Sequence, residues 1–420
     1  MSAVKHRDFQ LLSFGQLLSD VGNWLLVVAV PYHVFEVTGS TLETSVALLS
    51  GTLPALLIGP LAGVFVDRWE RRLTMLVTDL VRAACVGSMV FAQGGDKLWL
   101  LYLLLFSENV FGQFFDPART ALIPVIVGRG RDLASANSIH SLIDGTVRLL
   151  GAPLGGILLV ATGFTGVLLI DAATYVVSAC CIVLVRVRSR PSRSESRAAV
   201  RTIMRELGEG IGYLAGRSVL RGILVATLAF ALANGALTVL LVPFVREMLN
   251  GDSKMLGVLL SALGLGYLVG VPLTRWAVER FSVRNLTAAS ILPIGVLFYV
   301  MFNLRSPVAV ATLMAAAGIP GAMWLMTSRT ALQRFTADRL MGRASSGYSA
   351  VEMTGTLSGT LLGSILAERI GLSTTLDAMS VLLIVTGCAA GLLVPASRGG
   401  VQPGEEPAES TSALSEEKSA

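Results

Sequence analysis

The chain has 420 residues, of which 53% are hydrophobic and only 15% are charged, and its mean hydropathy is +0.69. A soluble protein of this length cannot bury so much apolar surface, so the composition excludes an ordinary soluble domain and predicts an integral membrane protein. The formal net charge of +5 is no argument for nucleic-acid binding, because the basic residues gather in the segments between apolar stretches.

Each crossing of the hydrocarbon core must be a helix of about 20 residues that satisfies its own backbone hydrogen bonds. The fold class is therefore predicted to be all-α. The first stretch is long enough to bend at Pro31, and the last two are separated only by a tight break near Gly371. We predict twelve transmembrane helices, at residues 9–36, 42–66, 73–93, 98–116, 134–161, 165–187, 221–247, 255–276, 285–303, 307–328, 345–369 and 372–395.

Three short sequence patterns recur at nearly one spacing, in the same order. They indicate a duplicated gene, and in so apolar a chain two parallel six-helix repeats are typical of a secondary transporter. Arg119-Thr120-Ala121-Leu122 recurs 210 positions later as Arg329-Thr330-Ala331-Leu332. Asp67-Arg68-Trp69-x-x-Arg72 recurs 212 positions later as Glu279-Arg280-Phe281-x-x-Arg284. Gly151-x-x-x-Gly155-x-Ile157-Leu158 recurs 208 positions later as Gly359-x-x-x-Gly363-x-Ile365-Leu366.

The repeat divides the chain into two pseudo-symmetric lobes of six helices each. We predict an N-terminal lobe at 1–187, a basic linker at 188–220, a C-terminal lobe at 221–395 and a disordered tail at 396–420. The latter part of the linker, about 199–216, is expected to form a helix on the inner leaflet, where its basic residues favour anionic lipid. The alternative is a linker that only anchors the topology.

Basic residues in the loops predict the orientation. With both termini and the linker in the cytoplasm, the inner segments contain 26 of the 33 Lys and Arg residues and the outer segments contain five. No other arrangement of an even number of spans gives so uneven a distribution. We therefore predict a multi-pass protein of the cell inner membrane with both termini cytoplasmic.

Motifs of enzymes and metal sites are not found. The four cysteines all lie inside predicted spans, the three histidines do not cluster, and neither a nucleophile elbow nor a phosphate-binding loop is present. We therefore expect no catalytic activity, no metal and no cofactor, and transport energy from an ion gradient or a partner subunit rather than from an ATP site in this chain.

One loop closely resembles the signature of the major facilitator superfamily between its second and third helices. The resemblance covers 9–395 and implies the fold of that superfamily, with a central cavity that alternates between the two faces. Within the superfamily the chain is similar to bacterial drug exporters related to macrolide and siderophore efflux proteins. The stretches are Gly59-Pro60-Leu61-Ala62-Gly63 with Asp67-Arg68-Trp69 for the loop, and Thr38-Gly39-Ser40, Phe115-x-Pro117-Ala118-Arg119, Leu133-Ala134-x-Ala136-Asn137 and Ile170-Asp171-Ala172 for the exporter branch.

In the family, the loop signature is held to latch the outward-facing state. The resemblance assigns this role here to Gly63, Asp67, Arg68, Arg71 and Arg72. A contact that forms in only one state biases the equilibrium by its differential energy. The alternative is a turn whose charges only fix the topology.

Gly151, Pro153, Gly155 and Gly156 in the fifth span resemble the antiporter motif of the family, which is associated with export. The match is incomplete, because Ala152 stands where a glycine usually precedes the proline. Small residues also permit close helix packing of no special function, and this alternative stays open.

Ionisable residues inside spans are costly in hydrocarbon and should face the interior. Asp20, Glu108 and Glu352 are the candidates for proton coupling, because a buried carboxyl group can take up and release a proton. Related exporters carry an arginine in the fourth helix four residues before a glycine, whereas here Glu108 precedes Gly112. Each carboxylate could instead be a hydrogen-bonded part of the cavity wall.

The substrate cavity is predicted near the middle of the membrane. Gln16, Asp20 and Asn23 recur at helical spacing and form one polar stripe, with Trp24 beside it. Asp144 and Arg148 are four residues apart and are expected to neutralise each other. The candidate cavity residues are Asp20, Asn23, Trp24, Glu108, Phe111, Asn234, Trp324 and Glu352.

These features together predict a secondary active transporter that exports an amphipathic small molecule in exchange for protons. We expect a monomer in the lipid bilayer whose partners are its small-molecule substrate and protons. Two alternatives stay open, a solute importer on the same fold and a membrane receptor or assembly subunit that transports nothing. The substrate leaves no short signature in the sequence.

Overall fold

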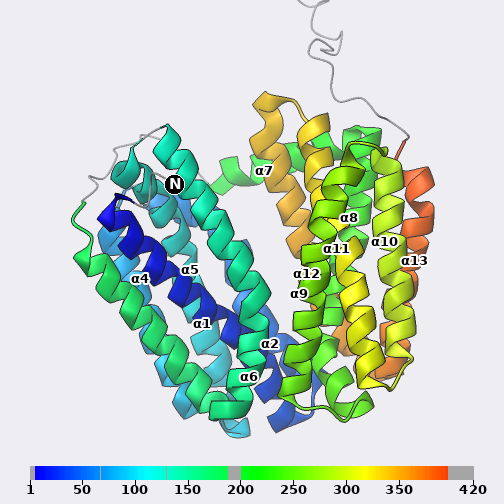
Figure 1. The fold of residues 1–420 in the computed structure, drawn as a ribbon, viewed down its shortest axis with the longest axis horizontal. Coiled ribbons are helices and arrows are strands. Elements are labelled where there is room, and N and C mark those ends of the chain that lie inside the picture. Colours follow the sequence, from blue (N-terminus) through cyan, green and yellow to red (C-terminus); the bar gives the residue numbers. More distant parts are fainter. Residues whose placement is uncertain (1–4, 67, 129, 188–199, 396–420) are drawn as a thin grey trace, which may run out of the picture.

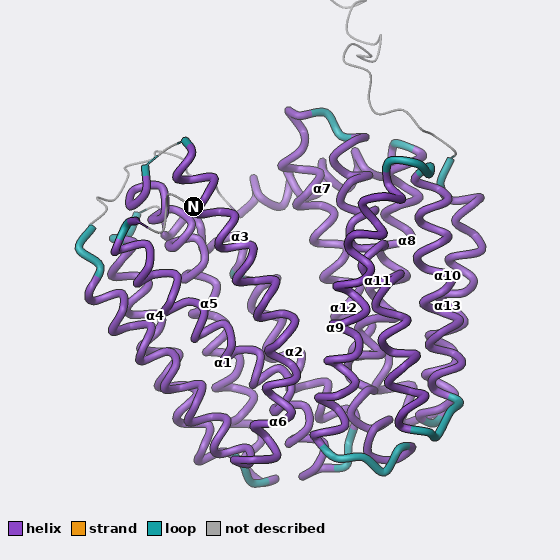
Figure 2. The backbone as a smooth tube through the Cα atoms, viewed as in Figure 1, coloured by secondary structure: helices purple, strands orange, loops and turns teal. Residues whose placement is uncertain are grey.

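The computed structural model describes residues 5–66, 68–128, 130–187 and 200–395. Across these ranges the regular structure is entirely helical, without a strand (Figure 2). The predicted all-α fold class is confirmed. Asp67 of the predicted latch, most of the first half of the linker and the tail at 396–420 lie outside the described residues.

The helices form two groups that stand side by side (Figure 1). We call the first the N-terminal lobe and the second the C-terminal lobe. The N-terminal lobe consists of α1 (Arg7–Thr38), α2 (Thr41–Leu57), α3 (Gly59–Val66), α4 (Arg71–Met89), α5 (Leu98–Val127) and α6 (Arg131–Leu184). The C-terminal lobe consists of α8 (Ser218–Pro243), α9 (Ser253–Val278), α10 (Val283–Phe302), α11 (Pro307–Phe335), α12 (Met341–Ile370) and α13 (Leu372–Leu393).

Within the described ranges, nine helices are long and apolar enough to cross a membrane. Each of the twelve predicted spans falls on a helix, but several bounds differ. The span predicted at 42–66 is two helices, α2 and α3, interrupted at Ile58. Helices α5 and α11 continue beyond the predicted ends at 116 and 328, to Val127 and Phe335. The apolar run marks where a helix leaves the hydrocarbon, whereas the helix itself extends into the polar sequence that follows.

Two glycines make sharp turns between neighbouring helices. Helix α6 covers two predicted spans, which meet at Gly163 with φ 67° and ψ 177°. Gly371, with φ 92°, separates α12 from α13. Both backbone conformations are readily adopted only by glycine, and the break predicted at Gly371 is confirmed.

The two lobes touch at one end and diverge at the other. The diverging end carries the N-terminus and α7 (Figure 1). At the opposite end, Glu368 of α12 accepts hydrogen bonds from the Ser40 hydroxyl at 2.9 Å and from the Leu42 backbone N–H at 3.2 Å. Arg246, just after α8, forms an ion pair with Glu36 of α1. These contacts hold the lobes together at the end away from the N-terminus.

Helix α7 (Val200–Gly216) occupies the segment where the sequence predicts a linker helix. It packs against α12 of the C-terminal lobe. Glu209 forms an ion pair with Arg343 at 2.8 Å, and the Tyr213 hydroxyl accepts a hydrogen bond from the Ala337 N–H at 3.3 Å. The glycine at position 210 lets α7 approach the α12 backbone closely. The linker helix is therefore held by the C-terminal lobe.

Candidate functional site

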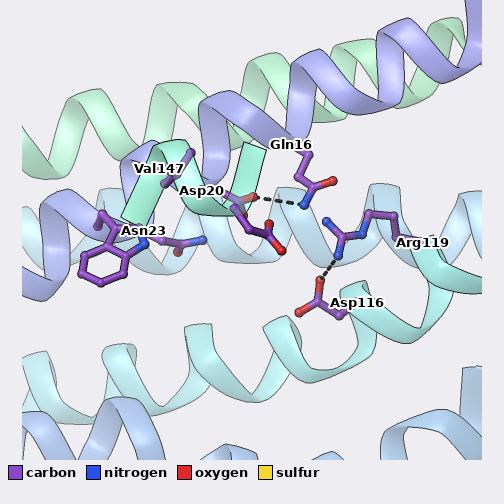
Figure 3. A pocket seen from close by; sticks show the side chains of 8 residues that line it. Gln16, Asp20, Asn23, Asp116, Arg119 and Val147 are labelled. Carbon is purple, nitrogen blue, oxygen red and sulfur yellow. Dashed lines mark hydrogen bonds and ion pairs between the residues drawn. The ribbon is translucent and has the colours of Figure 1, made fainter. Parts of the chain in front are cut away.

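A cavity of about 290 Å³ lies between α1, α5 and α6 of the N-terminal lobe (Figure 3). Among the described side chains, three carboxyl groups, those of Asp20, Asp116 and Asp144, line it together with one guanidinium group, that of Arg119. Its wall is therefore acidic unless protons or a cationic molecule balance the charge. The lining residues are Gln16, Asp20, Asn23, Trp24, Asp116, Arg119, Asp144 and Val147.

A chain of polar contacts runs along this cavity. Gln16 of α1 donates a hydrogen bond from Nε2 to Asp20 Oδ2 at 3.0 Å (Figure 3), and it lies 3.3 Å from His140 Nδ1 on α6. Arg119 forms an ion pair with Asp116 at 3.1 Å and contacts His140 Nε2 at 3.0 Å. The polar stripe predicted on α1 thus faces charged groups of α5 and α6.

Asp144 contacts a histidine of its own helix. Its Oδ2 lies 3.4 Å from His140 Nε2, one turn earlier on α6. The side chain of Arg148, the expected partner, lies outside the described part of the structure.

A second cavity of about 450 Å³ shares Asp20, Asn23 and Asp116 with the first. Much of its wall is apolar. Within the described residues, Thr238 of α8 is the one lining residue from the C-terminal lobe. The lining residues are Ser19, Asp20, Asn23, Leu26, Val27, Val30, Pro31, Ala47, Leu48, Gly51, Thr52, Arg82, Leu105, Glu108, Asn109, Gly112, Gln113, Phe115, Asp116 and Thr238.

Glu108 of α5 is paired with Arg82 of α4 at the wall of the second cavity. The guanidinium donates from Nε to Glu108 Oε1 at 2.8 Å, and its terminal nitrogen lies 2.7 Å from the same oxygen. The Tyr175 hydroxyl of α6 lies 2.8 Å from Glu108 Oε1 and also contacts Asn23 of α1. The Asn109 amide donates to Glu108 Oε2 at 2.7 Å. Four helices thus meet in one polar network, in which Glu108 has donors for both oxygens.

Arg82 also packs against the glycine that lies one helical turn after Glu108. A Cβ built on Gly112 would lie 3.5 Å from the Arg82 Cζ atom, so the guanidinium packs against that glycine. Glu108 of α5 is thus the counter-charge of Arg82 on α4. Sequence reasoning left Arg82 without a role, although an arginine inside a span should have a partner.

Four predicted site residues line neither cavity. Glu352 forms an ion pair with Arg329 at 3.0 Å, and both side chains are partly exposed. Trp324 is buried in the C-terminal lobe, with its ring 5.8 Å from that of Phe230. Asn234 is exposed on α8 and Phe111 is half-buried on α5. The candidates that the structure does bring together are Asp20, Asn23, Trp24 and Glu108.

Comparison with known proteins gives the family. The model of the transmembrane secretion effectors, a family of the major facilitator superfamily, matches residues 1–402. The chain belongs to this family. It is 26% identical over 402 residues to the multidrug efflux pump Tap of Mycolicibacterium fortuitum, covering 93% of this chain and 96% of that protein.

Two further relatives of this secretion effector are named as exporters. The putative bacilysin exporter BacE of Bacillus subtilis is 26% identical, over 75% of this chain and 77% of its own length. Macrolide efflux protein A of Streptococcus pyogenes is 24% identical, over 62% of this chain and 64% of its own.

Solved structures show the same fold at low sequence identity. A mutant of the nucleoside transporter NupG has a TM-score of 0.72 at 12% identity, with 92% of this chain and 100% of that chain covered. A bacterial homologue of the lysosomal transporter Spinster, in an inward-facing and unoccupied conformation, has a TM-score of 0.70 at 14% identity, with 92% and 97% covered. The predicted facilitator fold is confirmed.

The arginines of the predicted latch make contacts inside the N-terminal lobe. Arg71 donates to the Ala121 carbonyl of α5 at 3.1 Å. Arg72 donates to the carbonyls of Ile182 and Val183 at 3.0 and 2.6 Å, at the C-terminal end of α6, where a cation is favourable. Arg68 is exposed, and nothing lies within 4 Å of a Cβ built on Gly63. The latch therefore stays a prediction for this secretion effector.

The glycines of the antiporter-like motif face two different helices. A Cβ on Gly151 would lie 2.5 Å from the Trp24 Cβ, and one on Gly155 would lie 3.2 Å from the Val28 Cβ, both on α1. A Cβ on Gly156 would lie 2.7 Å from the Gly257 Cα of α9, which belongs to the C-terminal lobe. Gly156 thus permits close contact between the lobes. The Pro153 side chain lies outside the described residues.

Proposed function

We propose that this protein exports an amphipathic, positively charged small molecule in exchange for protons. The observation that carries the proposal is the pair of adjoining cavities, whose walls combine apolar side chains with an excess of carboxyl groups. Apolar walls with a few placed polar groups are typical of small-molecule sites. The names of the relatives, which are pumps and exporters of small molecules, support the direction of transport.

The charges in the cavities favour a cationic substrate. In the smaller cavity, the described lining side chains include three carboxyl groups and one guanidinium group, that of Arg119. In the larger one, Arg82 balances Glu108 and Arg119 is paired with Asp116, so Asp20 is left without a cationic partner among the described lining side chains. A positively charged substrate with an apolar body would place its charge near Asp20 and its body against the apolar wall. The surplus of carboxyl groups would disfavour an anion.

Alternating access would follow from rocking of the two lobes. If the basic inner segments lie in the cytoplasm, the lobes touch at the outer end through Glu368 and Arg246, and the structure corresponds to the inward-facing state. Substrate would then enter from the cytoplasm. Closure of the inner end would bring the C-terminal lobe to the loop of Asp67 and form the latch.

Protons would compete with substrate for the carboxyl groups. Asp20 is our first candidate, because it lines both cavities. Glu108 is ion-paired and Glu352 lies outside both cavities, so each would act only after its pairing changes. We propose the proton as the coupling ion and a monomer as the transporting unit.

Transport in vesicles tests this function. Proteoliposomes that hold the purified protein are loaded with ethidium, an amphipathic cation, and efflux is followed with and without an imposed pH gradient. We expect gradient-driven efflux for the unmodified protein and its loss in Asp20→Asn, while downhill exchange survives. Asp377→Asn is a matched control and should transport normally, because this half-buried carboxylate lines neither cavity and accepts a hydrogen bond from the Asn303 amide at 2.8 Å. Efflux that ignores the gradient in the unmodified protein would refute proton antiport.

Two cell-based assays separate the alternatives. An exporter lowers the ethidium associated with cells, whereas an importer raises it and a non-transporting receptor leaves it unchanged. A susceptibility panel with and without the protein would identify the substrates. For the orientation, a single cysteine at Ser194, after the native cysteines are replaced, should resist an impermeant reagent in intact cells. Ready labelling would reverse the topology.

A further inference from the structure

Two more carboxyl groups are buried around the network of Arg82 and Glu108. Asp79 lies on α4, one turn before Arg82, and Asp171 lies on α6, one turn before Tyr175. Both are 0% exposed, and neither lines either of the two cavities described above. Asp171 lies within electrostatic reach of Glu108 and Arg82, and Asp79 within reach of Arg82 and Asp20. The function proposed above makes no use of them.

These two carboxyl groups have far fewer hydrogen-bond donors around them than Glu108 has. Glu108 receives hydrogen bonds on both oxygens. Asp171 Oδ2 accepts none, and its Oδ1 has only the Thr174 hydroxyl at 3.3 Å. Asp79 faces the Ser178 hydroxyl, but neither of its oxygens accepts a hydrogen bond of ordinary geometry. An ionised carboxylate needs such donors when it is buried.

The charge balance leads to the same conclusion. The cluster contains one guanidinium, that of Arg82, and three carboxyl groups. If all were ionised, the interior would carry two excess negative charges, and each unpaired buried ion is strongly unfavourable. Among the described residues, no group of three or more His, Cys, Asp or Glu converges as a metal site. Protons are therefore the cations that fit.

A glycine of the neighbouring helix α1 leaves the space that the Asp171 carboxyl group occupies. A Cβ on Gly22 of α1 would overlap Asp171 Oδ1 and the Thr174 hydroxyl. Glycine at this position gives the carboxyl group its place against the α1 backbone, next to Asn23 of the network. The charged and titratable groups that face the cluster are Asp20 from α1, Asp79, Arg82 and Cys85 from α4, Glu108 from α5, and Asp171 and Tyr175 from α6.

We propose that Asp79 and Asp171 are proton-binding sites of the transport cycle, each holding a proton while Arg82 is paired with Glu108. The proposal rests on the proton antiport put forward above and adds two sites to it. Arg82 can stabilise only one or two carboxylates at a time. When it turns from Glu108 to Asp79 or Asp171, that group becomes the new partner and its proton passes to Glu108, which is thereby neutral. When Arg82 turns back, Glu108 releases a proton to water in the larger cavity, which it lines, and the aspartate takes up another. Each step moves one proton and exchanges one ion pair.

Infrared spectroscopy tests the protonation directly. A protonated carboxyl group has a carbonyl stretch that is distinct from the carboxylate bands and shifts in heavy water. We expect this band in the unmodified protein at neutral pH, and a partial loss in Asp79→Asn and in Asp171→Asn. Asp96→Asn, an exposed aspartate in the loop before α5, is the matched control and should leave the band unchanged. No such band, or one that both variants retain in full, would overturn the proposal.

Proton flux tests the role in transport. In the same proteoliposomes, a pH-sensitive dye reports the protons that move when an ethidium gradient is imposed. Asp79→Asn and Asp171→Asn should reduce this flux at least tenfold while they still bind ethidium. Asparagine resembles the protonated side chain, so both variants should fold, and melting curves verify this. If the unmodified protein shows no flux, the antiport fails, and the infrared result still decides whether the two groups hold protons. Full flux in both variants would refute their role.

Discussion

Replacing Gly156 by alanine should change the balance between the two positions of the lobes. A Cβ at this residue would lie 2.7 Å from the Gly257 Cα and 3.0 Å from the Ser253 carbonyl oxygen. Both are backbone atoms of α9, so no side chain can turn aside. The methyl group forces α6 and α9 apart, and overpacking of this kind costs about 1–3 kcal/mol. The cost arises only in the state in which the two helices touch.

A cost of about 1–3 kcal/mol in one state shifts the equilibrium between the states by about 5- to 150-fold. Alanine also stabilises a helix interior by about 0.5–1 kcal/mol relative to glycine. That gain is the same in both states, so it leaves their ratio unchanged. Gly145→Ala is the matched control, because it lies on the same helix and nothing is within 4 Å of a Cβ there.

The assay measures the distance between the lobes. After replacement of the native cysteines, spin labels are attached at Lys97 and Arg305, which are exposed at the end where the lobes touch. Double electron–electron resonance should show a larger population of long distances in Gly156→Ala than in the parent, and no such growth in Gly145→Ala. Identical distributions in the two variants would show that the contact of α6 with α9 does not set the balance.

Three further substitutions probe the ion pairs and the latch. Glu108→Gln should lower the free energy of unfolding by about 3–5 kcal/mol, because the buried Arg82 loses the carboxylate that it contacts at 2.7 Å. Melting curves in detergent check this, and the double variant with Arg82→Gln should recover part of the loss. Arg246→Gln should cost only about 0.2–1 kcal/mol, because the side chains of Arg246 and its partner Glu36 are 32% and 52% exposed. Added salt should change the spin-label distances of the parent more than those of Arg246→Gln. An equal change in both proteins would contradict this prediction. Asp67→Asn should reduce ethidium export at unchanged membrane insertion, and full export would leave Asp67 with a topological role only.

The sequence predicts the helices of this fold well, because hydrophobic length and glycine breaks are local properties. The break at Gly371 and the linker helix at 199–216 can both be predicted from such local properties. The end of α5 was not, because the polar residues after position 116 resemble a loop, although they continue the helix to Val127. Helix ends outside the hydrocarbon depend on packing that the apolar pattern does not record.

The site is predicted less completely, because the direction in which a side chain points depends on how helices pack. Asp20, Asn23 and Trp24 share one face of α1, and periodicity alone places them together. Trp324 belongs to the core of its lobe, since an aromatic residue in a span packs against neighbours as readily as it lines a cavity. Asp79 and Arg82 are adjacent on α4, but no local signal shows that α5 brings Glu108 to them.

The duplication itself shows where the two lobes have diverged. Arg329 is the repeat counterpart of Arg119, 210 positions later. The spacing of 208 positions between Gly151 and Gly359 also makes Glu352 the counterpart of Asp144. Arg329 contacts Glu352 directly at 3.0 Å, whereas His140 stands between Arg119 and Asp144, at 3.0 and 3.4 Å. Both lobes thus keep an arginine that faces an acidic residue on the next long helix.

The buried network has no such counterpart at the position related to Glu108. Arg119 of α5 and Arg329 of α11 are 210 positions apart in the two repeats, and the same spacing makes Gly318 the counterpart of Glu108. Gly318 packs directly on the α9 backbone, where a Cβ would lie 2.7 Å from the Gly266 Cα. One copy of this position therefore holds an ion pair, and the other holds two helices in close contact. The proton exchange that we propose around Arg82 and Glu108 therefore has no counterpart at this position of the C-terminal lobe.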